Sequence, residues 1–143
     1  MHASRFAAAI LAALHFPVLA QEPATGVPPE KLTFEKDIKP ILREKCLHCH
    51  NRKTLPDKPG FENAKRAFVK TPGGLSVIVP GDPEKSLMIT AISLNSMHEG
   101  SMPMVGERPT AEEISLLKRW IKEGANWPKG RKGKIKPPFH ARE

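Results

Sequence analysis

The feature that most constrains this chain is the run Cys46-Leu47-His48-Cys49-His50, which contains both of its cysteines. Two thiols at this spacing can add to the two vinyl groups of a haem, and the adjacent histidine is then held beneath the iron. The run therefore predicts one haem c, bound covalently through Cys46 and Cys49, with His50 as an axial ligand of the iron.

Other uses of a cysteine pair fit the sequence less well. A redox-active Cys-x-x-Cys usually follows a strand, and no strand is expected before Cys46. A zinc site needs four ligands, and the spare histidines beyond residue 20 are His48, His98 and His140. A structural disulfide in an exported protein needs no histidine after it. His48 is expected to face outward and to have no role beyond surface packing.

A second axial ligand is expected from the irregular segment 95–109, which is rich in methionine, glycine and proline. Its candidates are Met97, His98, Met102 and Met104. Met102 is favoured because Pro103 restricts its own backbone and that of the residue before it, as a loop of defined geometry requires. The alternative is that these methionines only fill gaps in the core.

The two ends of the chain differ in composition from its middle. Residues 1–20 carry Arg5, an apolar run and a small-residue end, which predicts a secretory signal peptide; an uncleaved anchor is the alternative. Residues 21–31 are expected to form a linker and 32–127 the domain. Residues 128–143 contain a large part of the net charge of +8 and are expected to form a basic, disordered tail. The protein is therefore expected to be periplasmic or otherwise exported, and soluble after cleavage.

Hydrophobic spacing predicts an all-α fold of about four helices around the haem, without a strand. The first helix begins after Thr33 and is either kinked at Pro40 or starts late. Further helices are predicted over residues 61–69 and from Asp82 to about Leu94, with Pro83 at the first helical position. The last begins with a capping box, Thr110 to Glu113, and stops at Gly124. Expected pocket walls are Leu42, Leu87, Met88, Ile92, Ile114, Leu117 and Trp120.

Four segments resemble the planctomycete-type cytochrome c domain of the class I cytochrome c superfamily. They are Phe34–Leu42, Val79–Leu87, the pair Met102-Pro103, and Thr110–Trp127, so that the resemblance covers roughly residues 32–127. It implies a class I cytochrome c fold with its first and last helices crossing, and His50 and Met102 axial to iron. The sequence departs from the family at Met104, where a second proline is usual, and over 60–68, which lacks the usual glycine-leucine-rich pattern.

The favoured function is that of a monohaem c-type cytochrome, a single-electron carrier between redox partner proteins rather than an enzyme. The alternative is a haem-based sensor or peroxidase-like protein whose distal ligand is absent or displaced, for which His98 and Glu99 are the nearest acid/base groups. A third hypothesis is a docking module that uses the basic tail to contact an acidic partner or a membrane surface. The chain is expected to be a monomer, and no aromatic residues interleave with its basic ones as nucleic-acid binding would favour.

Overall fold

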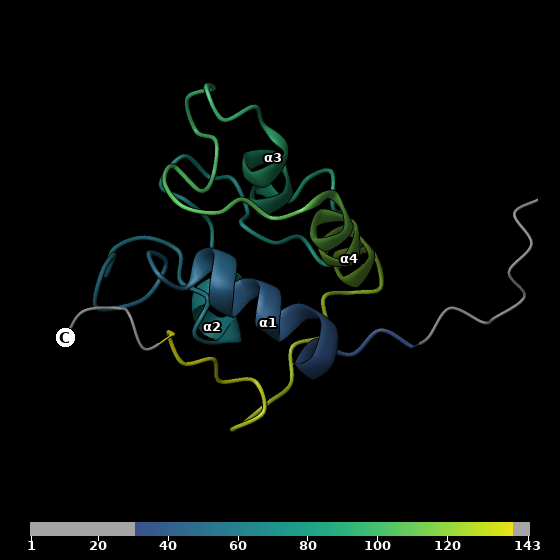
Figure 1. Ribbon diagram of the computed structural model, residues 1–143. Coiled ribbons are helices and arrows are strands. Elements are labelled where there is room, and N and C mark those ends of the chain that lie inside the picture. The colour runs from purple at the N-terminus through teal and green to yellow at the C-terminus, as the bar shows by residue number, and fades with distance from the viewer. Residues whose placement is uncertain (1–30, 139–143) are drawn as a thin grey trace, which may run out of the picture. The chain divides into compact units, whose positions relative to one another are not determined.

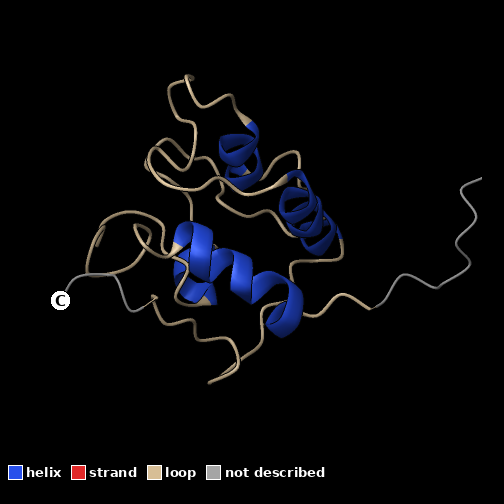
Figure 2. Ribbon diagram, in the orientation of Figure 1, coloured by secondary structure: helices blue, strands red, loops and turns tan. Residues whose placement is uncertain are grey.

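The computed structural model describes residues 31–138. The predicted signal peptide, most of the predicted linker, His140 and residues 139–143 lie outside the described residues. The described part is helical and irregular, with no strand (Figure 2). It contains one isolated backbone bridge, between Lys70 and Ser76. This agrees with the predicted all-α class. No helix in this part of the chain is long and apolar enough to cross a membrane.

The first helical segment runs from Phe34 to Cys46, through π-helical η1 (Phe34–Ile38), α1 (Lys39–Ile41) and π-helical η2 (Leu42–Cys46). Thr33 caps its start, with its hydroxyl accepting from the Lys36 N–H. Of the two predicted possibilities, the helix does not start late. Because Pro40 lacks an N–H and its ring crowds the preceding turn, the wider π-type turns on either side accommodate it.

Two shorter helices follow. Helix α2 (Ala64–Ala67) is capped by Asn63, whose side chain accepts from the Arg66 N–H. Helix α3 (Leu87–Ser93) starts after Ser86. The prediction that Asp82 begins this helix was wrong: Asp82 instead accepts from the Lys85 N–H in a turn. The buried Ser86 hydroxyl bonds the Val79 N–H and the Asp82 carbonyl, which separates the turn from the helix.

Helix α4 (Ala111–Lys122) has both of its predicted ends. Thr110 and Glu113 form the capping box, each side chain accepting from the other's backbone N–H. At the far end Gly124 has φ +102°, where a β-carbon would be strained. The N–H groups of Gly124 and Ala125 bond the carbonyls of Ile121 and Trp120, which is a Schellman motif.

The core is one apolar cluster contributed by all the helices. Helix α4 packs against α3, beside which it lies in Figure 1, and against η1. The rings of Phe34, Trp120 and Trp127 lie 4.7 to 5.9 Å apart. The first and last helices, which are predicted to cross, are therefore in contact. Of the expected pocket walls, the buried ones are Leu42, Met88, Ile92, Leu117 and Trp120, while Leu87 and Ile114 are partly buried.

Residues 128–138 differ from the solvated tail that their composition predicts. Ile135 is 3% exposed and belongs to the core cluster. Its N–H bonds the Glu62 carbonyl, and the Trp127 indole N–H donates to the Gly133 carbonyl at 2.7 Å. A β-carbon on Gly133 would lie 1.7 Å from the Pro128 carbonyl oxygen, so only glycine allows this close return of the chain. The buried Ile135 side chain and these two hydrogen bonds hold the segment in place among its lysines.

Candidate haem-attachment site

The cysteine run lies directly at the end of the first helical segment. The N–H groups of Cys49 and His50 both bond the Cys46 carbonyl, at 3.3 and 2.9 Å, so that the three residues share one turn. The two cysteines are not joined by a disulfide; Cys49 is exposed and Cys46 partly buried. Burial raises the pKa of the Cys46 thiol to about 12, with a smaller contribution from the Glu113 carboxylate. Redox-active cysteine pairs have the opposite shift, toward the thiolate.

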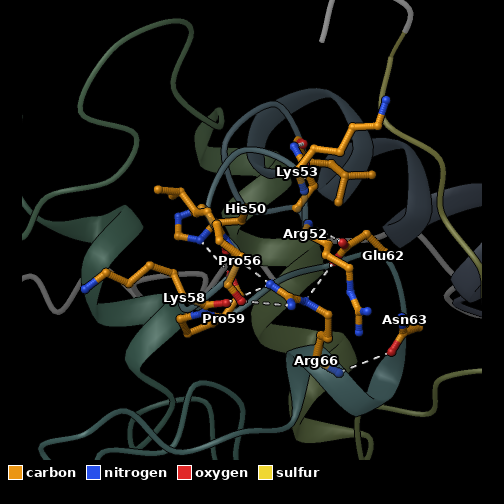
Figure 3. Close-up of polar contacts among 12 residues, drawn as sticks. His50, Arg52, Lys53, Pro56, Lys58, Pro59, Glu62, Asn63 and Arg66 are labelled. Atoms are coloured by element: carbon orange, nitrogen blue, oxygen red, sulfur yellow. Dashed lines mark hydrogen bonds and ion pairs between the residues drawn. The ribbon is translucent and has the colours of Figure 1, made fainter. Parts of the chain in front are cut away.

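A backbone carbonyl holds the imidazole of His50. Its Nδ1 lies 2.9 Å from the Pro59 carbonyl oxygen (Figure 3). A carbonyl can only accept, so Nδ1 carries a proton, and in the neutral ring the lone pair is then on Nε2. The Phe61 ring meets the imidazole edge-on at 5.7 Å. His50 is therefore oriented, in the right tautomer, to coordinate a metal through Nε2.

Asn51 is a buried residue of the site that the sequence interpretation missed. Its amide N–H groups donate to the carbonyls of Leu47 and His48 and to the Thr54 hydroxyl, and its side-chain oxygen accepts from the N–H groups of Lys53 and Thr54. It is 2% exposed. Asn51 thus closes the turn directly after His50. Asparagine's tendency to cap turns was the available signal.

The candidates for the second axial ligand differ in burial. Met97 and Met104 are 92% and 82% exposed, and His98 is exposed as well. Met102 packs against the core, and its N–H bonds the Ala91 carbonyl in α3 at 2.9 Å. Met102 is therefore the member of this set that the fold holds in place. No hydrogen bond or ring contact among the described residues joins it to His50.

Arg108 organises the Met102 segment and was also missed. Its guanidinium donates to the carbonyls of Ile92 (3.1 Å) and Leu94 (2.8 Å) at the end of α3, and to the Ser101 hydroxyl (2.8 Å). Ser101 is buried and directly precedes Met102. The planar, multi-donor guanidinium suits such a cluster of oxygens. A single arginine in an irregular loop gave no sequence signal for this role.

The donor set fits a covalently held haem. Two thiols share a turn with an imidazole whose Nε2 lone pair is available, and a thioether is held against the core. Within residues 31–138 no three His, Cys, Asp or Glu side chains gather as a metal site of the zinc type. His48 is exposed, as predicted. Two surface hollows of this part of the chain contain none of Cys46, Cys49, His50 and Met102.

A helical domain with this turn is typical of c-type cytochromes. Residues 46–103 match the family described as planctomycete cytochrome C, which confirms the resemblance for this segment. The matched segment begins at Cys46 and ends at Pro103, and is shorter than the resemblance over 32–127. No curated protein and no solved structure matches the chain significantly. A cytochrome c domain implies covalently bound haem c and an electron carrier.

Proposed function

We propose that this protein is an exported monohaem c-type cytochrome that passes single electrons between redox partners. The observation that carries the proposal is the 2.9 Å contact between His50 Nδ1 and the Pro59 carbonyl, on the same turn as two cysteines. It prepares Nε2 as a ligand and orients the ring before any metal binds. The family match over residues 46–103 supports the same function.

Each residue of the site has a distinct role in this proposal. Cys46 and Cys49 would hold the haem covalently, each S–H adding across one vinyl group so that the sulfur bonds the carbon next to the ring and the hydrogen goes to the outer carbon. His50 would bind the iron through Nε2, and Met102 would offer its thioether as the second ligand. The haem, when bound, would supply reversible one-electron chemistry between Fe(III) and Fe(II). With both ligands in place, the iron would offer no open position to a substrate.

The basic C-terminal segment is the candidate docking surface for an acidic partner. The side chains of Lys129, Arg131, Lys132, Lys134 and Lys136 are exposed, and residues 128–138 contain no acid. Because Ile135 anchors this segment in the core, deleting it would damage the fold as well as the charge. Replacing the five cations by glutamine isolates the charge. Slower electron transfer to an acidic partner, with a weaker dependence on salt, would support docking here.

The proposal is tested by absorption spectra of the oxidised and reduced protein, made in a host that attaches haem c. We expect a c-type reduced spectrum and the weak far-red band of a methionine bond to Fe(III). Met102→Ala should remove that band and Met104→Ala should keep it. Absence of covalently bound haem would refute the proposal. A high-spin Fe(III) spectrum, with carbon monoxide binding to the reduced wild type, would instead favour the sensor or peroxidase-like function.

A further inference from the structure

The loop of residues 52–60 contacts His50 through the Pro59 carbonyl, and it also contacts Arg66, which forms a partly buried ion pair with Glu62. We propose that Arg66, together with Glu62, is a positioning residue for His50, because it holds the Pro59 carbonyl against the imidazole Nδ1. The inference rests on the proposed function, since it concerns the strength with which His50 would bind iron. Pro59 itself cannot be held through its own nitrogen, which has no hydrogen.

Arg66 forms hydrogen bonds with the residues on both sides of Pro59. Its guanidinium donates to the carbonyl of Lys58 at 2.9 Å, and its own backbone carbonyl accepts from the Gly60 N–H at 3.2 Å. The guanidinium also donates to the carbonyls of Leu55 (3.2 Å) and Pro56 (3.1 Å), as Figure 3 shows for Pro56 and Lys58. Three loop carbonyls thus converge on one planar cation, which lysine could not reproduce.

Glu62 holds the guanidinium in this orientation. Its Oε2 lies 3.2 Å from Arg66 Nε, as an ion pair without the alignment of a hydrogen bond. The side chains are 17% and 18% exposed, so water screens the pair only partly. The other oxygen of Glu62 accepts from the Arg52 N–H, near the start of the same loop. The pair therefore joins both ends of the loop to the start of α2.

Gly60 leaves the space that the pair occupies. A β-carbon at this position would lie 2.4 Å from both Glu62 Oε2 and Arg66 Nε, so either the pair or the loop must move. Gly73 is the matched position in the neighbouring turn, because a β-carbon there would meet only the Thr71 hydroxyl, at 3.8 Å. Neither glycine has a positive φ, so alanine is not strained by its backbone at either site.

The physical consequence concerns the basicity of the imidazole. A carbonyl held close to Nδ1–H makes Nε2 a stronger donor, which favours Fe(III) over Fe(II). If the carbonyl is released, the reduced form should be favoured. Water entering a loosened loop, or loss of a nearby positive charge, would favour Fe(III) instead. A substitution that leaves the charge unchanged therefore distinguishes the two effects. Loss of His50 positioning should raise the reduced-to-oxidised ratio, and general loosening of the loop should lower it.

The test uses the haem-bearing full chain with Arg66→Lys and Gly60→Ala, both of which keep the charge. Arg119→Lys and Gly73→Ala are the controls; Arg119 pairs with Glu123 on the exposed face of α4, with the same i,i+4 spacing as Glu62 and Arg66. We expect both test variants to raise the reduced-to-oxidised ratio at a fixed potential by about threefold or more. Solvent exchange of the His50 Nδ1 proton, followed by NMR, should become roughly fivefold faster. The controls should change neither.

Two results would overturn the inference while leaving the proposed function intact. In the first, the wild type carries haem c, but Gly60→Ala and Arg66→Lys have the same reduced-to-oxidised ratio and the same His50 Nδ1 proton exchange rate as the wild type. The other is a shift of both variants toward Fe(III). If Arg66→Lys fails to fold, Gly60→Ala alone decides. A wild type without covalent haem would refute the proposed function and this inference together.

Discussion

Arg108 offers the sharpest test of how the Met102 segment is held. Replacing it by methionine keeps a long apolar stem and removes every donor that reaches Ile92, Leu94 and Ser101. The end of α3 then loses its cap, and the hydroxyl of the buried Ser101 loses its donor. We expect the segment 94–103 to loosen and the protein to lose stability.

The magnitude follows from these three contacts, because the fourth hydrogen bond of Arg108, to the Pro103 carbonyl, is long at 3.5 Å. Each hydrogen bond from a charged donor contributes about 1.5–3 kcal/mol. The Arg108 side chain is only partly buried, so water can replace part of what is lost. We therefore expect a total loss of roughly 3 kcal/mol, below the sum of three separate bonds. For a domain of about 100 residues this corresponds to a decrease in Tm of roughly 12–24 °C.

The assay is denaturant unfolding of the full-length, haem-bearing protein. Arg119→Met is the matched control, because its exposed ion pair with Glu123 should contribute under about 1 kcal/mol. Arg108→Lys keeps the charge but cannot reach three acceptors at once, so it should recover less than half of the loss. A stability of Arg108→Met within about 0.5 kcal/mol of the wild type would refute the reasoning.

Three further predictions concern other parts of the domain. Ile135→Ala should cost roughly 2–4 kcal/mol, because it opens a cavity in the core, while Lys136→Ala should be nearly neutral; equal effects in urea unfolding would contradict the packed C-terminal segment. Thr110→Ala should cost about 1 kcal/mol and Thr110→Ser much less, since serine preserves the capping hydroxyl; thermal melts of both variants check this. The hydrogen bond to Glu107 raises the pKa of Lys45 above its ordinary value of 10.5, and nearby carboxylates, led by Glu113, add to this against the effect of burial. Because the folded-state pKa is raised, this contribution to stability is fully present below 10.5 and is lost as the pH rises from 10.5 through the folded-state pKa. The stability gap between wild type and Lys45→Met should therefore shrink over that range; a constant gap would exclude this linkage.

The sequence determined the features that depend on neighbouring residues. The capping box at Thr110 and the stop at Gly124 are local hydrogen-bond and φ requirements, and both lie where they were predicted. The helix entering the cysteine run followed from its apolar spacing, and the run itself pointed to haem c chemistry, which the family match supports. Asp82 shows the limit of local signals, because an aspartate can cap a turn as well as a helix. In the folded chain Asp82 caps a turn, and the hydrogen bond of the buried Ser86 hydroxyl to the Val79 N–H separates this turn from the helix.

Contacts between distant residues could be decided only by the tertiary structure. The tail composition predicted solvation, but the free energy of burying one side chain, Ile135, outweighs the surrounding charge because the lysines remain in water. The sequence left four candidates for the second ligand, and the fold partly buries Met102 against the core while exposing Met97, His98 and Met104. The guanidinium contacts of Arg66 and Arg108 have no sequence signature, since backbone carbonyls are present at every residue and only the folded chain brings three of them to one cation.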